Sequence, residues 1–389
     1  MESKKYLLIL ILIPLVLKLF IAYTVYDPGN ILNPSKDKVG FVNIADFRLM
    51  NKLLEKEIDP FDIPIPEGEE YAKIKDGTVW LGYGPLYYLW ASLLREPFHF
   101  TVKILPIISE TIISILLFLM IKRKFTAGTA FIGALIFALN PLSIQFTAIQ
   151  GQFDMIPILF VFLSYYLRDN KYLSAVCLGI GASFKYFFPL LIAGMFVFRY
   201  KEKIKFGLTT TLTMLICYIP FILNGNFFNS IKKQIGYTPQ FNWGFAKLFI
   251  LFNLKPSILV NYGKYILLLA LIVFLIIQTE LELRQAYLIM FYSFYFFTMF
   301  IHPIYFLWIV PFLFIDLREH SIWFLIMCTL HIFFLHSIRY ITTGLNLTFS
   351  YTWYYSALSF IFGVLTWIAC FKAINSLKIV QIPKNQWRF

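Results

Sequence analysis

The sequence predicts an all-α integral membrane protein with about twelve transmembrane helices. Of its 389 residues, 59% are hydrophobic and 14% are charged, whereas charged residues make up about a quarter of a soluble domain. A helix of about 20 apolar residues spans a bilayer, and roughly 230 apolar residues supply on the order of eleven such helices. This composition excludes a soluble enzyme, so we interpret residues 1–389 as a single polytopic membrane domain.

The charge balance is positive, since 34 Lys and Arg face 21 Asp and Glu. In a soluble chain a net charge of +13 would indicate nucleic-acid binding. Here most basic residues stand between apolar runs, where they orient helices and contact lipid headgroups, so we expect membrane lipids and no nucleic acid as partners. The cysteines lie inside apolar runs without metal-ligand spacing, which predicts buried packing residues and neither disulfides nor a zinc site: Cys177, Cys217, Cys328 and Cys370.

The first apolar run, residues 6–26, predicts an uncleaved transmembrane helix, because no small-residue cleavage pattern follows it. Its basic N-terminal flank stays cytoplasmic, which places residues 27–102 in a long external loop. Further runs follow at 104–121, 126–145, 154–167, 172–185, 186–199, 206–223, 262–279, 285–301, 303–316, 320–337 and 352–372. One tilted helix would also cover 172–199, but it would put the basic cluster 201–205 outside. Charge therefore favours two short helices there.

Short basic loops fall on one side of these helices, at 122–124, 168–171, 199–205, 284, 318 and after 372. Lys and Arg in short loops mark the cytoplasmic side. The unusual polar residues then gather on the opposite, external face, and both the plasma membrane and the endoplasmic reticulum fit this orientation.

The external loop contains a predicted amphipathic helix over 46–58, because its apolar positions recur at spacings of three and four. Asp46 stands at its start, either as an N-cap or as a functional carboxylate. An acidic stretch at 66–70 indicates a solvated loop. The aromatic segment 80–90, which includes Tyr83, is typical of an element at the level of the lipid headgroups.

Two later turns carry ionisable residues at the predicted external edge of the membrane. Gln152 and Asp154 lie between two apolar runs, and such residues are costly at that depth unless they face a cavity or a partner. The alternative is that Asp154 caps the helix that follows. Lys185 lies between two further runs, where it either snorkels to the headgroups or pairs with a lipid phosphate or Asp154.

His302 and Arg339 complete the predicted polar cluster, each at another external helix turn. No spacing of His or carboxylates is typical of a metal site, and the sequence has neither a phosphate-binding glycine loop nor a nucleophile motif. We therefore expect no metal and no cofactor.

Several short motifs resemble the GT-C fold glycosyltransferases, polytopic enzymes that use polyprenyl- or dolichyl-phosphate-linked sugars. One helix is followed by a long external loop with Asp46-Phe47, and further matching motifs follow along the chain: Asp59-Pro60-Phe61, Tyr83-Gly84-Pro85-Leu86, Asn140-Pro141, Gly151-Gln152-Phe153-Asp154 and Ser183-Phe184-Lys185 with Pro189. The last three look like the mannosyltransferases and glucosyltransferases of N-glycan assembly. The turn at 57–61 departs from the commoner pattern, which leaves the donor sugar open.

The resemblance implies that Asp46 is the general base of an inverting transfer, with Asp27 and Asp154 as rival bases. It also implies that Lys185, aided by His302 or Arg339, stabilises the phosphate of the leaving group. The expected donor is a polyprenyl- or dolichyl-phosphate hexose, mannose by resemblance, and the acceptor is a lipid-linked glycan, a glycolipid or a protein.

The main alternative is a flippase for lipid-linked oligosaccharides or another polytopic transporter. Such proteins usually show paired repeats and broken helices with polar residues at the bilayer midplane. The sequence indicates neither feature, and it leaves open a third interpretation, a membrane scaffold without catalysis.

Overall fold

The structure is a computed structural model, and it describes residues 2–24, 72–74, 77–79, 83–95, 97–223, 228, 265, 267, 269–275, 281–298, 303–315, 319–332 and 352–378. Contacts between residues group the chain into two compact units, Met1–Thr238 and Pro239–Phe389. The described part is helical except for one short two-stranded sheet.

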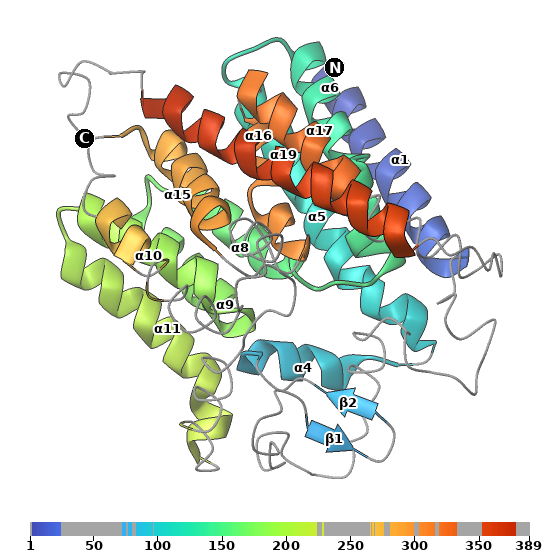
Figure 1. Cartoon of the computed structure of the whole chain (residues 1–389). Helices are drawn as coiled ribbons and strands as arrows, with labels where there is room; N and C mark the ends of the chain where they lie inside the picture. Colours follow the sequence, from blue (N-terminus) through green and yellow to red (C-terminus); the bar gives the residue numbers. More distant parts are fainter. Residues whose placement is uncertain are drawn as a thin grey trace. The chain divides into compact units, whose positions relative to one another are not determined.

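The described elements of the first unit follow one another as shown in Figure 1: α1 (Glu2–Thr24), β1 (Ala72–Ile74), β2 (Gly77–Val79), α4 (Pro85–Leu93), α5 (Phe98–Lys122), α6 (Ala127–Ala138), α7 (Pro141–Ser143), the π-helix η1 (Ile144–Ile149), α8 (Met155–Tyr166), α9 (Lys171–Phe184), α10 (Phe187–Arg199) and α11 (Lys203–Leu223). Helix α5 packs against α1, α6 and α8, and α9 packs against α8, α10 and α11. In the second unit the described elements are α15 (Leu283–Phe297), the 3-10 helix η3 (Pro303–Trp308), α16 (Val310–Phe314), α17 (Glu319–Ile332) and α19 (Thr352–Lys378).

Four helices of the described chain are long and apolar enough to cross a membrane: Ser3–Thr24, Phe100–Lys122, Ala127–Ile149 and Lys203–Leu223. Helix α11 exposes large apolar side chains at every fourth position over its length, at Ile204, Leu208, Leu212 and Ile216. A continuous apolar stripe of this kind is unfavourable in water and favourable in lipid. These helices support an integral membrane protein.

Three other apolar helices of the first unit are shorter than a bilayer. The predicted runs at 154–167, 172–185 and 186–199 do form the separate helices α8, α9 and α10, of 12, 14 and 13 residues. At 1.5 Å per residue they measure about 18–21 Å, against about 30 Å of hydrocarbon. The two-helix interpretation of 172–199 is confirmed, whereas twelve spans remain a prediction.

Proline explains two of the interruptions. Lys185 is extended between α9 and α10, with φ −151° and ψ 109°, and Pro189 stands four residues later. A proline ring clashes with the carbonyl four residues before it, so one helix cannot run through Lys185. Pro311 acts in the same way on Leu307, and the predicted helix 303–316 is divided into η3 and α16. The break at Lys185 agrees with the predicted split of 172–199, whereas the break inside 303–316 is not predicted from the sequence.

The segment before α4 differs from the prediction of a purely helical and irregular external loop. Strands β1 and β2 pair antiparallel, with Ala72 opposite Val79. Helix α4 then buries Tyr87, Tyr88 and Trp90, so these aromatic side chains pack inside the protein instead of at the headgroups. The predicted amphipathic helix 46–58 lies outside the described residues.

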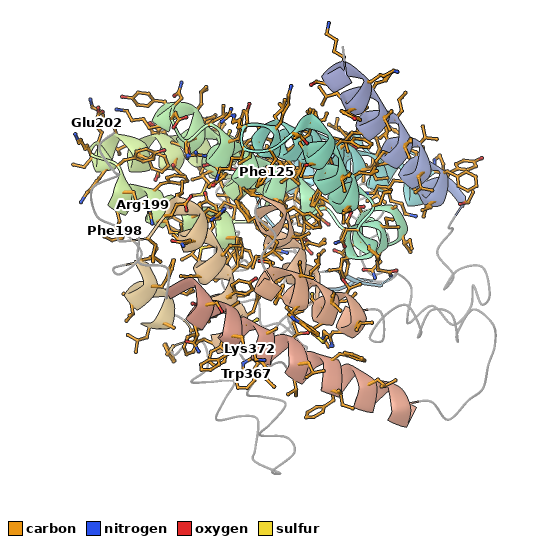
Figure 2. All side chains as sticks on the ribbon, turned by 90° about the horizontal axis from the view of Figure 1, so that it is seen from above. Phe125, Phe198, Arg199, Glu202, Trp367 and Lys372 are labelled. Atoms are coloured by element: carbon orange, nitrogen blue, oxygen red, sulfur yellow. The ribbon has the colours of Figure 1, made fainter. Side chains whose placement is uncertain are left out.

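The basic cluster 199–205, which the sequence predicts on the cytoplasmic side, spans the end of α10, the turn after it and the start of α11. Glu202 forms ion pairs there with Lys171 and Lys205, the second at 3.0 Å. These hydrogen bonds lower the pKa of the Glu202 carboxyl to about 2. Figure 2 shows Arg199 and Glu202 together at this turn.

Candidate functional site

Two turns of the first unit meet at a buried ion pair. The Lys185 Nζ donates to Asp154 Oδ1 at 2.7 Å, and their side chains are 12% and 2% exposed. Asp154 precedes α8, and Lys185 separates α9 from α10. Because removing two charges from water costs several kcal/mol per ion, such a pair persists only with close contact and further polar partners.

A left-handed glycine turns the chain toward Asp154. Gly151 has φ +67°, and a Cβ there would lie 3.1 Å from Val102 Cγ1 and 3.2 Å from Lys103 Cγ. The Gln152 N–H then donates to the Phe146 carbonyl at 2.8 Å, which closes the turn after η1. This geometry requires glycine, because L side chains are disfavoured at positive φ.

Aromatic rings surround the pair on the side of α4. The Phe153 ring lies 4.7 Å from Tyr83, 4.8 Å from Tyr87 and 6.4 Å from Trp90, measured between centroids. The Lys185 Nζ lies 5.7 Å from the centroid of Phe153. The rings exclude water and add a cation–π contact to the lysine.

A second glycine brings α4 against the end of α9. The Gly84 N–H donates to the Phe184 carbonyl at 3.1 Å. A Cβ at Gly84 would stand 2.1 Å from the Ser183 carbonyl oxygen, far inside van der Waals contact. The motifs around Gly84 and Lys185, about 100 residues apart in the sequence, therefore meet directly.

The structure decides two alternatives that the sequence leaves open. Asp154 occupies the N-cap position of α8, but its side chain makes no capping hydrogen bond, so the capping interpretation is wrong. Lys185 directs its ammonium to Asp154 and not to the surface, which excludes simple snorkelling. Tyr83 and Gln152 lie in the same neighbourhood, one in the aromatic wall and one in the turn. The other predicted site residues lie outside the described residues: Asp27, Asp46, His302 and Arg339.

A second buried polar cluster joins α1, α5 and the start of η1, and sequence analysis missed it. Lys18 pairs with the Glu110 carboxylate, and its Nζ also lies 3.1 Å from Ser143 Oγ. Ser143 and Thr147 both donate to Glu110, the latter at 3.0 Å. The four residues are 1% exposed or less. Lys18 and Glu110 interrupt apolar runs, and an ionisable residue inside a spanning segment is itself a signal of function or pairing.

Two further polar side chains lie close to the Gly151 turn. Lys103 is fully buried and donates to the Ala22 carbonyl at 3.2 Å, in the last turn of α1, where a cation is favoured by the helix dipole. Gln150 is 3% exposed, and its Nε2 finds no hydrogen-bond partner within the described part of the chain. A buried donor without a partner is rare, which makes Gln150 a candidate contact for a polar ligand.

No group of three or more His, Cys, Asp or Glu among the described residues could hold a metal ion. Cys328 and Cys370 are buried, as predicted, whereas Cys177 and Cys217 are only half-buried. The chain matches no protein-family model, and no curated protein is significantly similar to it in sequence.

Proposed function

We propose that this protein is an inverting membrane glycosyltransferase. It moves a hexose, mannose being favoured, from a polyprenyl- or dolichyl-phosphate donor to a lipid-linked glycan, a glycolipid or a protein on the external face. The observation that carries the proposal is the buried pair of Asp154 and Lys185, which brings together two of the motifs that resemble those of GT-C enzymes.

The pair is suited to hold a phosphate at the edge of a membrane. An ammonium group has three donors, and the hydrogen bond to Asp154 uses one of them. The aspartate orients Lys185 and offsets the cost of burying its charge. A phosphate oxygen that approaches this ammonium meets a fixed positive charge as its own negative charge grows, and low polarity around the rings strengthens this attraction.

The transfer balances without a cofactor. An acceptor hydroxyl attacks the anomeric carbon, and its proton passes to a carboxylate. The bond from that carbon to the donor phosphate breaks on the opposite face, and its electron pair leaves with the polyprenyl phosphate beside Lys185. We assign the proton to Asp46, with Asp27 as the rival base. Asp154 is the poorer base, because it is already engaged by Lys185.

Labelled sugar transfer tests this proposal directly. The full chain, in vesicles with candidate acceptor lipids and a chelator, is given polyprenyl-phosphate mannose or polyprenyl-phosphate glucose. We expect transfer from one donor by the wild type. Loss of a general base lowers such a rate by about 100- to 10,000-fold, and we expect this from Asp46→Asn. The matched control Asp37→Asn removes another carboxylate of the same loop and leaves transfer unchanged.

Lys185 variants separate a charge effect from a folding effect. Lys185→Arg keeps the cation and retains part of the activity. Lys185→Met lowers the transfer rate by about 100- to 1,000-fold, the usual cost of removing one electrostatic stabiliser, and a melting curve reports whether the protein still folds.

Full activity of Asp46→Asn would assign the role of general base to Asp27. Absence of transfer from both donors, by folded wild-type protein, would contradict the enzyme proposal.

A transporter or flippase is the second candidate, and one observation favours it. Glu110 lies midway along α5 and pairs with Lys18 of α1, and ion pairs inside apolar helices, together with interrupted helices, are typical of transporters. A flippase assay with a fluorescent lipid-linked oligosaccharide distinguishes the two: the transporter moves the lipid without breaking its sugar–phosphate bond.

A further inference from the structure

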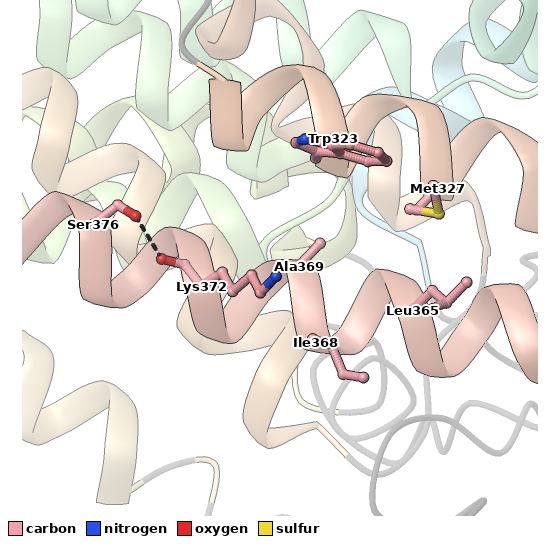
Figure 3. Close-up of a pocket in the computed structure, with 7 residues that line it drawn as sticks. All are labelled: Trp323, Met327, Leu365, Ile368, Ala369, Lys372 and Ser376. Atoms are coloured by element: carbon pink, nitrogen blue, oxygen red, sulfur yellow. Dashed lines mark hydrogen bonds between the residues drawn. The ribbon is translucent and has the colours of Figure 1, made fainter.

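An open groove runs between α17 and α19 in the second unit. It encloses about 560 Å³, and its walls are mainly apolar side chains: Trp323, Met327, Leu365, Ile368 and Ala369. Lys372 lines the same groove at the end nearer the C-terminus of α19 (Figure 3).

The groove is amphiphilic along its length. Leu365, Ile368 and Lys372 follow one another at spacings of three and four, so they form one stripe on α19. The stripe changes from apolar to cationic over about 10 Å, at 1.5 Å per residue. Trp323 and Met327, one turn apart on α17, form the facing wall, and Trp323 is 54% exposed.

The cation at the end of the groove is accessible to a ligand. Lys372 is exposed, and no salt bridge or side-chain hydrogen bond of its ammonium occurs within the described ranges of the chain. The neighbouring Ser376 hydroxyl donates to the Lys372 carbonyl at 2.9 Å, inside the helix. Figure 3 shows the Lys372 side chain extended back toward Ala369, the direction in which helical side chains lean.

We propose that this groove binds one anionic phospholipid of the cytoplasmic leaflet. The phosphate contacts Lys372, and an acyl chain lies on Ile368, Leu365 and the Trp323 wall. Charge complementarity decides the class of ligand, since an apolar groove with a cation at one end matches an apolar chain with an anionic headgroup. The basic tail after Lys372 indicates the cytoplasmic leaflet, where anionic lipids are abundant.

A second copy of the chain is a poorer occupant. The amphiphilic stripe extends over only about two helical turns, which is short for a helix–helix interface, and a two-fold dimer would bring two Lys372 ammonium groups together. The proposed lipid site depends only on a membrane location and not on glycosyl transfer, so failure of one leaves the other standing.

Trp323 provides a fluorescent probe inside the groove. Full-length protein is placed in vesicles of phosphatidylcholine that contain a fraction of brominated phosphatidylglycerol or brominated phosphatidylcholine. The signal of Trp323 is taken as the difference between the wild type and Trp323→Phe. A single Lys at a membrane surface favours an anionic lipid by about fivefold. We therefore expect brominated phosphatidylglycerol to quench Trp323 at about one fifth of the concentration that brominated phosphatidylcholine requires.

Charge variants decide whether Lys372 is responsible. Lys372→Gln should abolish the fivefold preference, and Lys372→Arg should keep it. The control Lys201→Gln removes an exposed lysine of the first unit and should change nothing. Equal quenching by both lipids in the wild type would overturn the proposal, because Trp323 would then face ordinary bulk lipid. Loss of the preference in Lys201→Gln as well would also overturn it.

A filling variant tests the groove without fluorescence. Ile368 and Ile361 are both exposed isoleucines of α19, at 40% and 49%, and only Ile368 lines the groove. Ile368→Trp should reduce the phosphatidylglycerol retained in native mass spectrometry, whereas Ile361→Trp should not. If the wild-type protein is a dimer and neither brominated lipid quenches Trp323, the lipid proposal is overturned, and a second copy of the chain occupies the groove.

Discussion

Breaking the buried pair of Lys18 and Glu110 is expected to destabilise the first unit strongly. Glu110→Gln leaves Lys18, whose side chain is 2% exposed, without its counter-ion. Removing one member of a buried ion pair costs about 3–5 kcal/mol. The destabilisation has an upper bound, because Lys18 can lose its proton instead of staying charged without a partner. Neutralising an ordinary lysine side chain at pH 7 costs about 4.6 kcal/mol, at 1.36 kcal/mol per pH unit.

The double variant Lys18→Met with Glu110→Gln is expected to recover most of this loss. It removes both charges, and apolar replacement of a buried pair is often nearly neutral. Gln keeps one acceptor oxygen, so one of the two hydroxyls of Ser143 and Thr147 loses its acceptor, at about 1 kcal/mol. We therefore expect the double variant to lie about 1 kcal/mol below the wild type, and above either single variant.

The free energy of unfolding in mixed micelles, measured by titration with a denaturing detergent, checks this order. Lys122→Met is the matched control, since it removes an exposed lysine from the end of the same helix α5. Additive single and double effects, with a coupling energy under about 0.5 kcal/mol, would refute the reasoning, because contacting residues normally couple more strongly.

Three further outcomes are expected. Gly84→Ala should loosen α4 from α9, because the added Cβ would overlap the Ser183 carbonyl. A protease should then cleave the loop before α4 faster than it does in the control Gly207→Ala, where the added Cβ has room. Gly151→Ala should cost about 1–2 kcal/mol of unfolding free energy from its positive φ alone. Glu202 should lose its ion pairs as the pH falls from about 4.5 toward its lowered pKa of about 2, so their stabilising contribution at neutral pH disappears in that window. An NMR titration of the Glu202 carboxyl measures this pKa, and a midpoint near 4.5 would contradict the prediction.

Patterns local in the sequence predict much of the helical structure. Helix α5 coincides with the run 104–121, and α11 with 206–223, because long apolar stretches have few alternatives in a membrane. The basic cluster 201–205 correctly favours two helices over 172–199. The pairing of Asp154 with Lys185 follows from the cost of burying either charge alone.

Contacts between distant residues are less visible. One glutamate lowers the mean hydropathy of a 25-residue helix only slightly, and the partner of Glu110 lies in the first helix, so nothing near Glu110 in the sequence indicates a salt bridge. The burial of Tyr87 and Trp90 is missed for a similar reason. Aromatic residues are common both at headgroups and in cores, and only the docking of α4 on the Phe153 turn decides between the two.

The separation of Lys18 from Glu110 has a consequence for synthesis of the protein. The two residues are 92 positions apart, from 110 minus 18. At a synthesis rate of about 5–20 residues per second, the ribosome adds Glu110 about 5–18 seconds after Lys18. During this interval Lys18 has no carboxylate in α5 to meet, and a lone lysine deep in a helix makes membrane insertion less favourable by about 3 kcal/mol. Helix α1 is therefore expected to settle at its final depth only after α5 has been made.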